Sequence, residues 1–266
     1  MKIDDKLKDI ELFVLDMDGT FYLSSNIIEG SLEFLEAVKK SGKRAVFFTN
    51  NSSKNKTGYI EKLAGMNCCI TEKEIMTSGD VTIEFLKRER PGKKVYLLGT
   101  PELEESFVNN GIILTDGSEK CDITVVGFDM TLTYEKLERA CTHIRNGAEF
   151  IATHPDINCP TSDGFIPDCG AFIAAISLST GVSPKILGKP YAETAEMISR
   201  VYGVDKSKIA FVGDRLYTDV ACGVKNGSVG ILVLSGETKR DDLEKSDIRP
   251  DFVYDRLVSM VTSADI

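Results

Sequence analysis

Two short acidic segments near opposite ends of the sequence could act together chemically. The first, DMDGT, holds Asp16 and Asp18, and the second, GDRLYTD, holds Asp214 and Asp219. Each segment follows a short apolar run that is typical of a strand buried on both faces. Because the carboxyl ends of parallel strands lie along one edge of an open sheet, we expect these carboxylates to converge there.

Two further segments bring polar and cationic groups to the same edge. FFTNN places Thr49, Asn50 and Asn51 directly after another apolar run, and LGKP places Lys189 in a loop before a helical stretch. We expect Thr49 and Lys189 to neutralise the oxygens of a transferring phosphoryl group. Asn50 and Asn51 are expected to donate to a phosphate or to contact the substrate.

The chemistry of such a set depends on a cation. Carboxylates clustered away from water repel one another strongly unless a positive charge offsets them. Mg²⁺ takes oxygen ligands, commonly one or two carboxylates together with waters and a substrate phosphate. A bound Mg²⁺ would let a phosphate dianion approach an ionised carboxylate. The segments therefore predict phosphoryl-transfer chemistry with Mg²⁺ as cofactor.

The order of these segments carries a family resemblance. DMDGT, FFTNNS, LGKP and GDRLYTD resemble, in that order, the four motifs of the haloacid-dehalogenase-like hydrolase superfamily. The long insertion between the second and third motifs resembles the NagD-like branch, in which an α/β cap of the C2 type lies at that place. The resemblance implies a doubly wound, Rossmann-like parallel-sheet core and a phosphatase acting on small phosphomonoesters.

The resemblance also implies roles for the acidic pair. Asp16 would be the nucleophile that forms an aspartyl phosphate. Asp18 would protonate the leaving oxygen and then act as the base for the hydrolytic water. This division agrees with the physical chemistry, because a metal-bound carboxylate stays ionised whereas one off the metal can have the raised pKa that an acid needs.

The remaining site residues are implied in the same way. Thr49 and Lys189 would bind the phosphoryl group. Mg²⁺ would be held by Asp16, the main-chain carbonyl of Asp18, and Asp214. Asp219 would ligate through water or orient Lys189.

The substrate is left open by the sequence. The family's range covers sugar phosphates, phosphoglycolate, nucleotides, pyridoxal phosphate and the artificial p-nitrophenyl phosphate. Within the insertion, ATHPD has His154 where Asn would be expected about as readily, so this residue is either a contact at the cleft or a turn residue before Pro155. The specificity of the loop 156–170 cannot be read from its residues.

Two other functions remain as alternatives. A receiver-like phosphoacceptor module also joins acids, Thr and Lys around Mg²⁺, but it accumulates the aspartyl phosphate as a signal. A phosphate-ester binder without turnover would keep its affinity when Asp18 is replaced by Asn. A calcium loop of the EF-hand kind is excluded, because its twelfth position would be Ile27 rather than Glu.

The elements that must position these residues follow from hydrophobic pattern. Apolar runs alternate with helical segments, which predicts an α/β fold with a parallel sheet. Residues 12–15, 45–48, 209–212 and 231–234 are the expected central strands. A crossover helix is expected over 31–42, with Ser31 as N-cap and Gly42 as C-cap.

The middle of the chain repeats this pattern on a smaller scale. Residues 95–99, 122–129 and 149–156 are expected strands, separated by helical stretches. We therefore expect a catalytic core formed by 1–79 and 184–266, with an α/β cap domain over 80–183 inserted in it.

Composition narrows the class of protein. The chain has 266 residues, with 32 basic and 41 acidic, for a net charge of −9. Nucleic acid and anionic membranes are unexpected partners, since both require clustered positive charge. The 7 cysteines form no C-x-x-C pair, and the longest apolar stretch is far short of about 18 residues, so a reducing, cytoplasmic location is expected. A homo-oligomer stays open.

Overall fold

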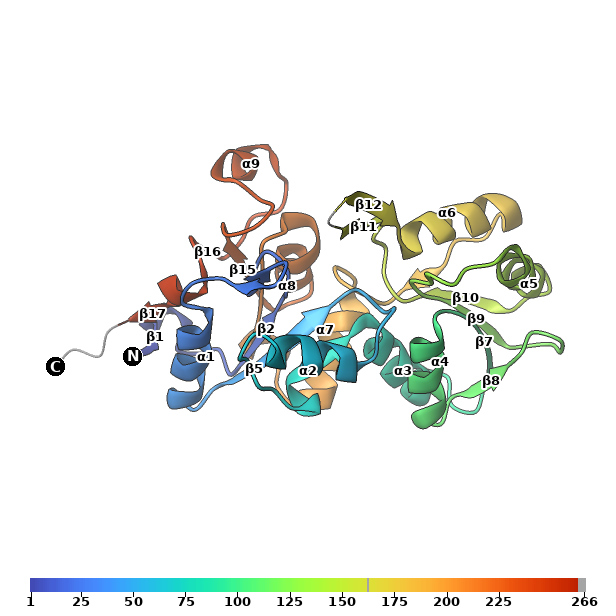
Figure 1. The fold of residues 1–266 in the computed structure, drawn as a ribbon, viewed down its shortest axis with the longest axis horizontal. Helices are drawn as coiled ribbons and strands as arrows, with labels where there is room; N and C mark the ends of the chain where they lie inside the picture. Colours follow the sequence, from blue (N-terminus) through green and yellow to red (C-terminus); the bar gives the residue numbers. More distant parts are fainter. Residues whose placement is uncertain (162, 263–266) are drawn as a thin grey trace. The chain divides into compact units, whose positions relative to one another are not determined.

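The computed structural model describes residues 1–161 and 163–262, which divide into two compact units (Figure 1). The first unit contains Met1–Thr49, Lys56–Met76 and the chain from Lys189 on. The second contains Asn50–Asn55 and Thr77–Gly188. The short segment Asn50–Asn55 thus groups by its contacts with the second unit, although we expected it with the core.

A six-stranded sheet forms the centre of the first unit. Its strands lie in the order β16-β15-β14-β2-β5-β6, and β2 pairs in parallel with both β5 and β14. The chain therefore builds the sheet outward from β2 in one direction and later returns to build it in the other. This reversal at β2 and β14 is the switch point at which open α/β sheets bind ligands. The strands are β2 (Leu12–Leu15), β5 (Arg44–Thr49), β6 (Ile75–Thr77), β14 (Ile209–Gly213), β15 (Val229–Val233) and β16 (Phe252–Tyr254).

Strands β2 and β14 are buried along their whole length, in agreement with their unbroken apolar sequences. Such sequences are required of parallel strands covered on both faces. The predicted central strands and the α/β class with its parallel sheet are therefore confirmed.

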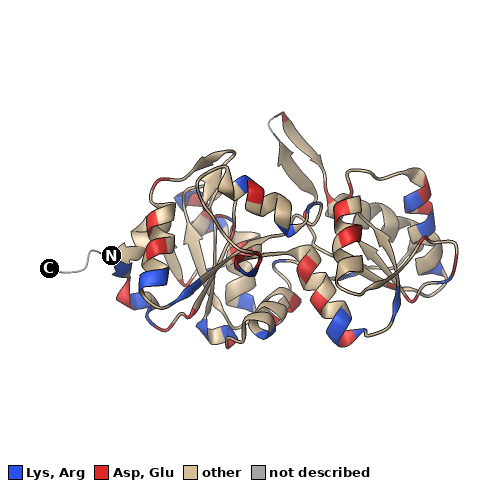
Figure 2. Ribbon diagram, turned by 60° about the horizontal axis from the view of Figure 1, so that its bottom comes forward, with Lys and Arg blue, Asp and Glu red and all other residues tan. Residues whose placement is uncertain are grey.

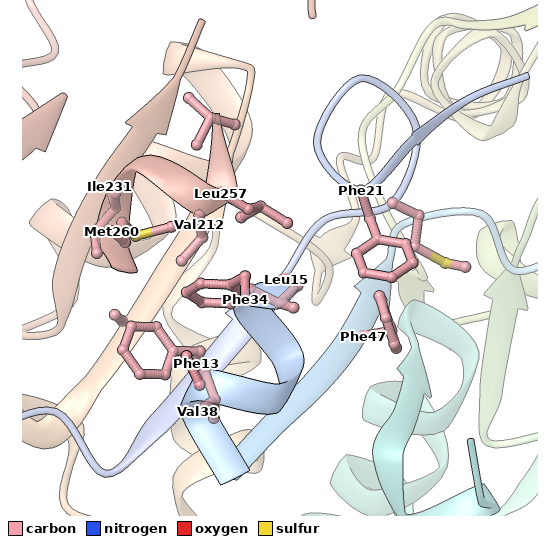
Figure 3. Close-up of a cluster of buried hydrophobic side chains, with 14 of the residues drawn as sticks. Phe13, Leu15, Phe21, Phe34, Val38, Phe47, Val212, Ile231, Leu257 and Met260 are labelled. Atoms are coloured by element: carbon pink, nitrogen blue, oxygen red, sulfur yellow. The ribbon is translucent and has the colours of Figure 1, made fainter. Parts of the chain in front are cut away.

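The hydrophobic core of this unit lies where helix α1 packs on the sheet (Figure 3). The ring of Phe34 on α1 meets Phe13 of β2 edge to face, with centroids 5.5 Å apart. Phe21 meets Phe47 in the same way at 4.8 Å. Full burial of each such side chain contributes about 1.5–3 kcal/mol, so the strand that precedes Asp16 rests on a rigid base.

Helix α1 (Ser31–Lys40) begins differently from our expectation. Its N-cap is Gly30, not Ser31, and Ser31 is already helical with its buried hydroxyl lacking a hydrogen-bond partner. Gly30 has φ +86°, a left-handed conformation that other residues adopt at a cost. At the other end the C-cap is Ser41, and Gly42 follows it with φ +69°. Local sequence favoured Ser as a cap, but a Cβ at the cap position would lie 2.4 Å from Cβ of Val258, so glycine is required there.

The other elements of the first unit surround the sheet. Its helices are α2 (Lys56–Ala64), α7 (Ala192–Tyr202), α8 (Ala221–Lys225) and α9 (Arg240–Lys245), with a π-helical turn η4 (Leu216–Val220). Short 3₁₀ turns are η1 (Asp5–Leu7), η2 (Glu72–Glu74), η3 (Lys206–Lys208) and η5 (Leu257–Met260). Two small antiparallel pairs join β1 (Lys2–Ile3) to β17 (Val261–Thr262) and β3 (Tyr22–Leu23) to β4 (Asn26–Ile27).

The second unit has its own parallel sheet in the order β13-β10-β9-β7-β8, with an antiparallel hairpin β11-β12. The strands are β7 (Lys94–Leu98), β8 (Ile113–Thr115), β9 (Ile123–Val126), β10 (Glu149–Ala152), β11 (Asn158–Thr161), β12 (Gly164–Pro167) and β13 (Lys185–Ile186). The helices are α3 (Ser78–Glu89), α4 (Pro101–Asn109), α5 (Tyr134–Arg145) and α6 (Cys169–Thr180). Strands β9 and β10 end earlier than expected, because the residues after them form loops with polar side-chain contacts.

Charges are interspersed over the helices, with acidic and basic residues next to one another (Figure 2). Many form i,i+4 pairs such as Arg139 with Glu135 and Arg200 with Glu196. Among the described residues, we find no helix with the length and apolar character needed to cross a membrane.

Candidate active site

Three acidic side chains from separate segments meet in the first unit. Asp16 follows β2, Asp214 follows β14, and Asp219 lies in η4. One carboxylate oxygen from each lies within 4.8 Å of the others. Asp214 and Asp219 are buried, and the side chain of Asp16 is 18% exposed. The structure thus brings together three of the four carboxylates that the sequence placed at this edge.

The pairing of β2 with β14 explains this convergence. Leu15 is in register with Val212, and the amide of Asp16 donates to the Val212 carbonyl at 2.9 Å. The residues after both strands are therefore neighbours. A Cβ on Gly213 would lie 2.2 Å from Cγ of Asp219, so only glycine lets η4 fold back over the strand end. Single π-helical turns of this kind are frequent at functional sites.

Lys189 supplies the cation of this cluster. Its side chain is 4% exposed, and Nζ lies 2.8 Å from Oδ1 of Asp16. Nζ also donates to Oδ1 of Asp219 and lies over the ring of Phe48, 5.2 Å from its centroid. A buried ammonium requires such partners, and here a single lysine joins two carboxylates.

The balance of charge in the cluster shifts several pKa values. Burial, followed by repulsion from Asp219, raises the pKa of Asp16 to about 7. The same two causes raise the pKa of Asp214 to about 6. Burial alone would lower the pKa of Lys189, but the charges of Asp16 and Asp219 raise it above its ordinary value. The chain itself therefore holds fewer positive charges here than the carboxylates require.

The donor set fits Mg²⁺ because it consists of hard carboxylate oxygens. Asp16 and Asp219 both contact Lys189, whereas the carboxylate of Asp214 accepts a hydrogen bond from the amide of Glu237. The three carboxylates together could hold a divalent metal, and the assignment of Asp16 and Asp214 as its direct ligands stays a prediction.

A loop after β15 holds Asp214 and was missed by sequence reasoning. The amide of Glu237 donates to Oδ2 of Asp214 at 2.7 Å, and the amide of Thr238 donates to the Asp214 carbonyl at 3.2 Å. The Ser235 hydroxyl donates to the carbonyl of Gly19 at 2.8 Å. The available signal was positional, since LSGET directly follows an expected central strand at the same sheet edge.

Three more residues border the cluster. Asp18 is exposed, and its main chain forms a bridge with Tyr22. Its carboxylate is not among the three that group together. The Thr20 hydroxyl lies 3.5 Å from Oδ1 of Asp214. Arg215, which the sequence analysis passed over, has Nε 3.0 Å from Glu237. Burial would lower the pKa of Arg215, but nearby negative charge, led by Asp16, raises it.

The predicted phosphate-binding segment Thr49–Asn51 is divided between the two units, with Thr49 in the first and the asparagines in the second. Thr49 is half-buried at the end of β5 in the first unit. Asn50 and Asn51 group with the second unit, where the Asn50 amide donates to both oxygens of Asp156 at 3.3 Å. Oδ1 of Asn51 accepts from the amide of Ser53 at 2.9 Å. Both asparagine side chains thus have local partners, and their contact with a phosphate stays a prediction.

Comparison with known proteins identifies the family. A model described as haloacid dehalogenase-like hydrolase matches residues 13–113, and one described as HAD-hydrolase-like matches residues 186–260. The acid sugar phosphatase of Staphylococcus aureus strain MRSA252 is 34% identical over 248 residues, which are 93% of this chain and 95% of that protein. The chain belongs to the haloacid dehalogenase-like hydrolase family. The family predicted from the motifs is confirmed.

Solved structures of this hydrolase family agree. The 4-nitrophenylphosphatase of Thermotoga maritima has a TM-score of 0.90 and 49% identity, over 96% of this chain and 97% of that one. NagD from Escherichia coli K-12 has a TM-score of 0.86 and 30% identity, over 94% of this chain and 97% of that one. The predicted NagD-like branch, the fold class and the enzyme class, a phosphatase, are therefore confirmed.

Proposed function

We propose that this phosphatase is Mg²⁺-dependent and hydrolyses small phosphomonoesters through an aspartyl phosphate on Asp16. The observation that carries the proposal is the cluster of Asp16, Asp214 and Asp219 at the switch point of the sheet, with Lys189 in contact with Asp16 and Asp219. It joins a carboxylate accessible to substrate with a buried cation and with donors suited to a divalent metal.

The reaction runs in two displacements. A carboxylate oxygen of Asp16 attacks phosphorus, and the bond from phosphorus to the ester oxygen breaks. Asp18, protonated at that stage, gives its proton to the departing alcohol. Water then attacks the phosphorus of the acyl phosphate while Asp18 takes a proton from it, and the bond from phosphorus to the Asp16 oxygen breaks. This step releases inorganic phosphate, restores the carboxylate of Asp16 and leaves Asp18 protonated again. The exposure of Asp18 suits a group that exchanges protons with substrate and water.

The other residues bind and orient. Lys189 and Thr49 bind the equatorial phosphoryl oxygens, with Asn50 and Asn51 as further donors. Asp219, in contact with Nζ, fixes the position of Lys189. Mg²⁺, held by Asp16, Asp214 and the main-chain carbonyl of Asp18, would offset the repulsion between phosphate and carboxylates and polarise the phosphoryl group.

We assign residues 80–183, which lie in the second unit, the role of a cap that excludes bulk water and selects the leaving group, with 1–79 and 184–266 as the catalytic core. The separate parallel sheet of this unit supports the assignment. The relatives' names make sugar phosphates and p-nitrophenyl phosphate the first substrates to try. Phosphoglycolate, nucleotides and pyridoxal phosphate complete the panel.

We also infer a cytoplasmic location with a small phosphorylated substrate as the main partner. None of the seven cysteines forms a disulfide, and five of them are buried. Cysteines outside disulfides in this number are typical of proteins in reducing compartments.

The test is release of phosphate from this panel with and without Mg²⁺, using Asp16→Asn as the control variant. We expect many turnovers that require Mg²⁺, and a fall in kcat of about 10⁴-fold or more in Asp16→Asn. Full activity in that variant would refute the assignment of the nucleophile. A single burst with stable phosphoprotein would favour the receiver-like alternative, which the comparisons do not support.

A further inference from the structure

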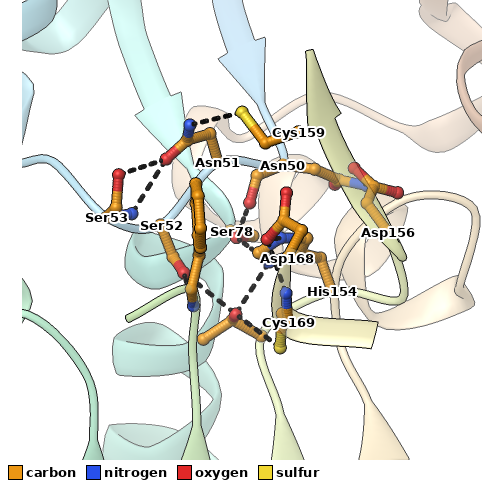
Figure 4. Close-up of polar contacts among 12 residues, drawn as sticks. Asn50, Asn51, Ser52, Ser53, Ser78, His154, Asp156, Cys159, Asp168 and Cys169 are labelled. Atoms are coloured by element: carbon orange, nitrogen blue, oxygen red, sulfur yellow. Dashed lines mark hydrogen bonds and ion pairs between the residues drawn. The ribbon is translucent and has the colours of Figure 1, made fainter. Parts of the chain in front are cut away.

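A buried polar network in the second unit surrounds His154 (Figure 4). His154 and Thr153 are 0% exposed, Ser78 is 0% exposed and Asp168 is 3% exposed. Nε2 of His154 lies 2.9 Å from Oδ1 of Asp168, and Nδ1 lies 2.8 Å from the Thr153 hydroxyl. Both ring nitrogens therefore have partners, although sequence analysis placed this residue in a turn or at the cleft.

The available protons determine which group donates in each hydrogen bond of the network. The amide of Phe128 donates to the Ser52 hydroxyl at 3.0 Å, and that hydroxyl lies 3.1 Å from the hydroxyl of Thr153. Ser52 can therefore donate to Thr153, Thr153 to Nδ1 of His154, and Nε2–H to Asp168. In this arrangement Ser52 and Thr153 each use their single proton once, and Sγ of Cys169 is a second, longer contact of the Thr153 hydroxyl at 3.8 Å. A network satisfied in this way is rigid, because each change of rotamer leaves a buried group without a partner.

The network ends on Asn50. The Ser78 hydroxyl lies 3.4 Å from Nδ1 of His154 and donates to the main-chain carbonyl of Asn50. The Asn50 side chain is held from another direction by Asp156. Asn50 directly follows Thr49, so the network fixes the peptide at which the predicted phosphate-binding segment enters the second unit.

Gly188 connects the same network to the lysine segment. A Cβ on Gly188 would lie 2.7 Å from Cβ of His154 and 2.9 Å from Oδ1 of Asn50. The residue just before Lys189 therefore packs directly on His154 and Asn50. Gly188 thus leaves room for only a hydrogen atom between the lysine segment and the residues His154 and Asn50.

Asp168 fixes the orientation of the imidazole. Its Oδ1 accepts from Nε2 of His154 and from the amide of Cys169 at 2.6 Å, as the N-cap of α6. The carboxylate is therefore anchored to a helix end and holds the histidine ring in one orientation.

We propose that His154 and Asp168 form a positioning pair that sets the main chain of Asn50 for binding of the phosphoryl group. The proposal rests on the proposed function, because it assigns the Thr49–Asn51 segment to phosphate binding. His154 is a positioning residue that acts by contact, since its Nδ1 lies 3.4 Å from the Ser78 hydroxyl that donates to the Asn50 carbonyl.

The test compares His154→Asn with a matched control, His143→Asn. His143 is the other histidine of the chain, is 8% exposed in the same unit, and packs against Tyr96 with ring centroids 5.1 Å apart. Asn at 154 cannot reach Asp168 and Thr153 together. For His154→Asn we expect KM for the ester and the inhibition constant for inorganic phosphate to rise by about tenfold, equivalent to about 1.4 kcal/mol.

The remaining readouts separate positioning from general destabilisation. The Mg²⁺ concentration for half-activation should stay within about twofold of wild type in His154→Asn, since the metal carboxylates belong to the first unit. Asp168→Asn keeps an oxygen acceptor for Nε2–H and should change KM less than His154→Asn. Wild-type KM and phosphate inhibition in His154→Asn, or equal changes in His143→Asn, would overturn the proposal.

Ser78→Ala provides a second test in case His154→Asn does not fold. Ser78→Ala removes the donor to the Asn50 carbonyl and leaves the pair of His154 and Asp168 intact. It should reproduce the rise in KM and in the phosphate inhibition constant, and unchanged values would overturn the proposal. If wild-type protein releases no phosphate from any ester, the proposed function fails. Calorimetric titration with inorganic phosphate then tests the pair alone, with weaker binding expected in His154→Asn and equal binding contradicting the proposal.

Discussion

The two units each bury a cluster of polar side chains, but the clusters differ in how their charges are balanced. In the first unit three carboxylates group together and two of them contact Lys189. Burial, followed by repulsion from Asp219, raises the pKa values of Asp16 and Asp214. In the second unit His154 and Asp168 form a network in which the ring nitrogens and the carboxylate have partners from the chain. A buried cluster with surplus charge indicates a site that completes itself with a ligand, whereas a satisfied network indicates a positioning framework.

Replacing Lys189 should give the largest difference in stability between the two clusters. Lys189→Met leaves Asp16 and Asp219 buried without their cation, so the free energy of unfolding without metal should fall by about 3–5 kcal/mol. Chemical denaturation followed by circular dichroism measures it. Adding Asp219→Asn to this variant should restore part of the loss, because one of the repelling charges is gone. Wild-type stability in the single variant would mean that the cluster carries no surplus charge.

Replacement of the proposed acid should affect rate and leave the cluster intact. In Asp18→Asn we expect kcat to fall by about 10²–10⁴-fold, the usual contribution of a general acid and base. Because Asp18 is exposed and stands apart from the three grouped carboxylates, stability should change by less than about 0.5 kcal/mol. Steady-state kinetics and thermal unfolding give both quantities. Unchanged kcat would favour a mere binder or another proton donor.

Mg²⁺ should stabilise the protein through the carboxylate cluster of the first unit and not through the His154–Asp168 network of the second. At about 100 times its dissociation constant, Mg²⁺ should raise the free energy of unfolding of the wild type by about 2.7 kcal/mol. Asp214→Asn should lose most of this gain, and Asp168→Asn should keep it. Thermal unfolding at a series of Mg²⁺ concentrations gives the comparison. An equal loss of the Mg²⁺-dependent stabilisation in both variants would mean that the metal does not bind specifically at the carboxylate cluster.

The smallest expected effect concerns the loop that holds Asp214. Ser235→Ala removes the hydrogen bond to the Gly19 carbonyl and should lower the free energy of unfolding by about 1 kcal/mol. Ser118→Ala, at an exposed turn, is the matched control and should change stability by less than about 0.5 kcal/mol. Urea unfolding resolves the two values. Identical values would mean that the Ser235 hydrogen bond does not anchor this loop.

The local pattern of apolar residues was sufficient to predict those elements whose position depends on burial alone. The unbroken apolar run of β2 predicted a central strand, and its position next to β14 placed Asp16 near Asp214. The same reasoning could not find features set by distant chain segments. Ser31 was expected to cap α1, but Gly30 does so because of the path of the chain. His154 was ambiguous in the sequence because its partners Ser78 and Asp168 come from two other elements.

Asp16 follows an inner strand of the six-stranded sheet, and this position limits which parts of the chain can accept substitutions. Because β2 is hydrogen-bonded on both sides, its amides should exchange with solvent only when the whole unit opens. The surface loops and the β11-β12 hairpin carry no such constraint from Asp16. Substitutions can therefore accumulate in those elements while the carboxylate of Asp16 keeps its place.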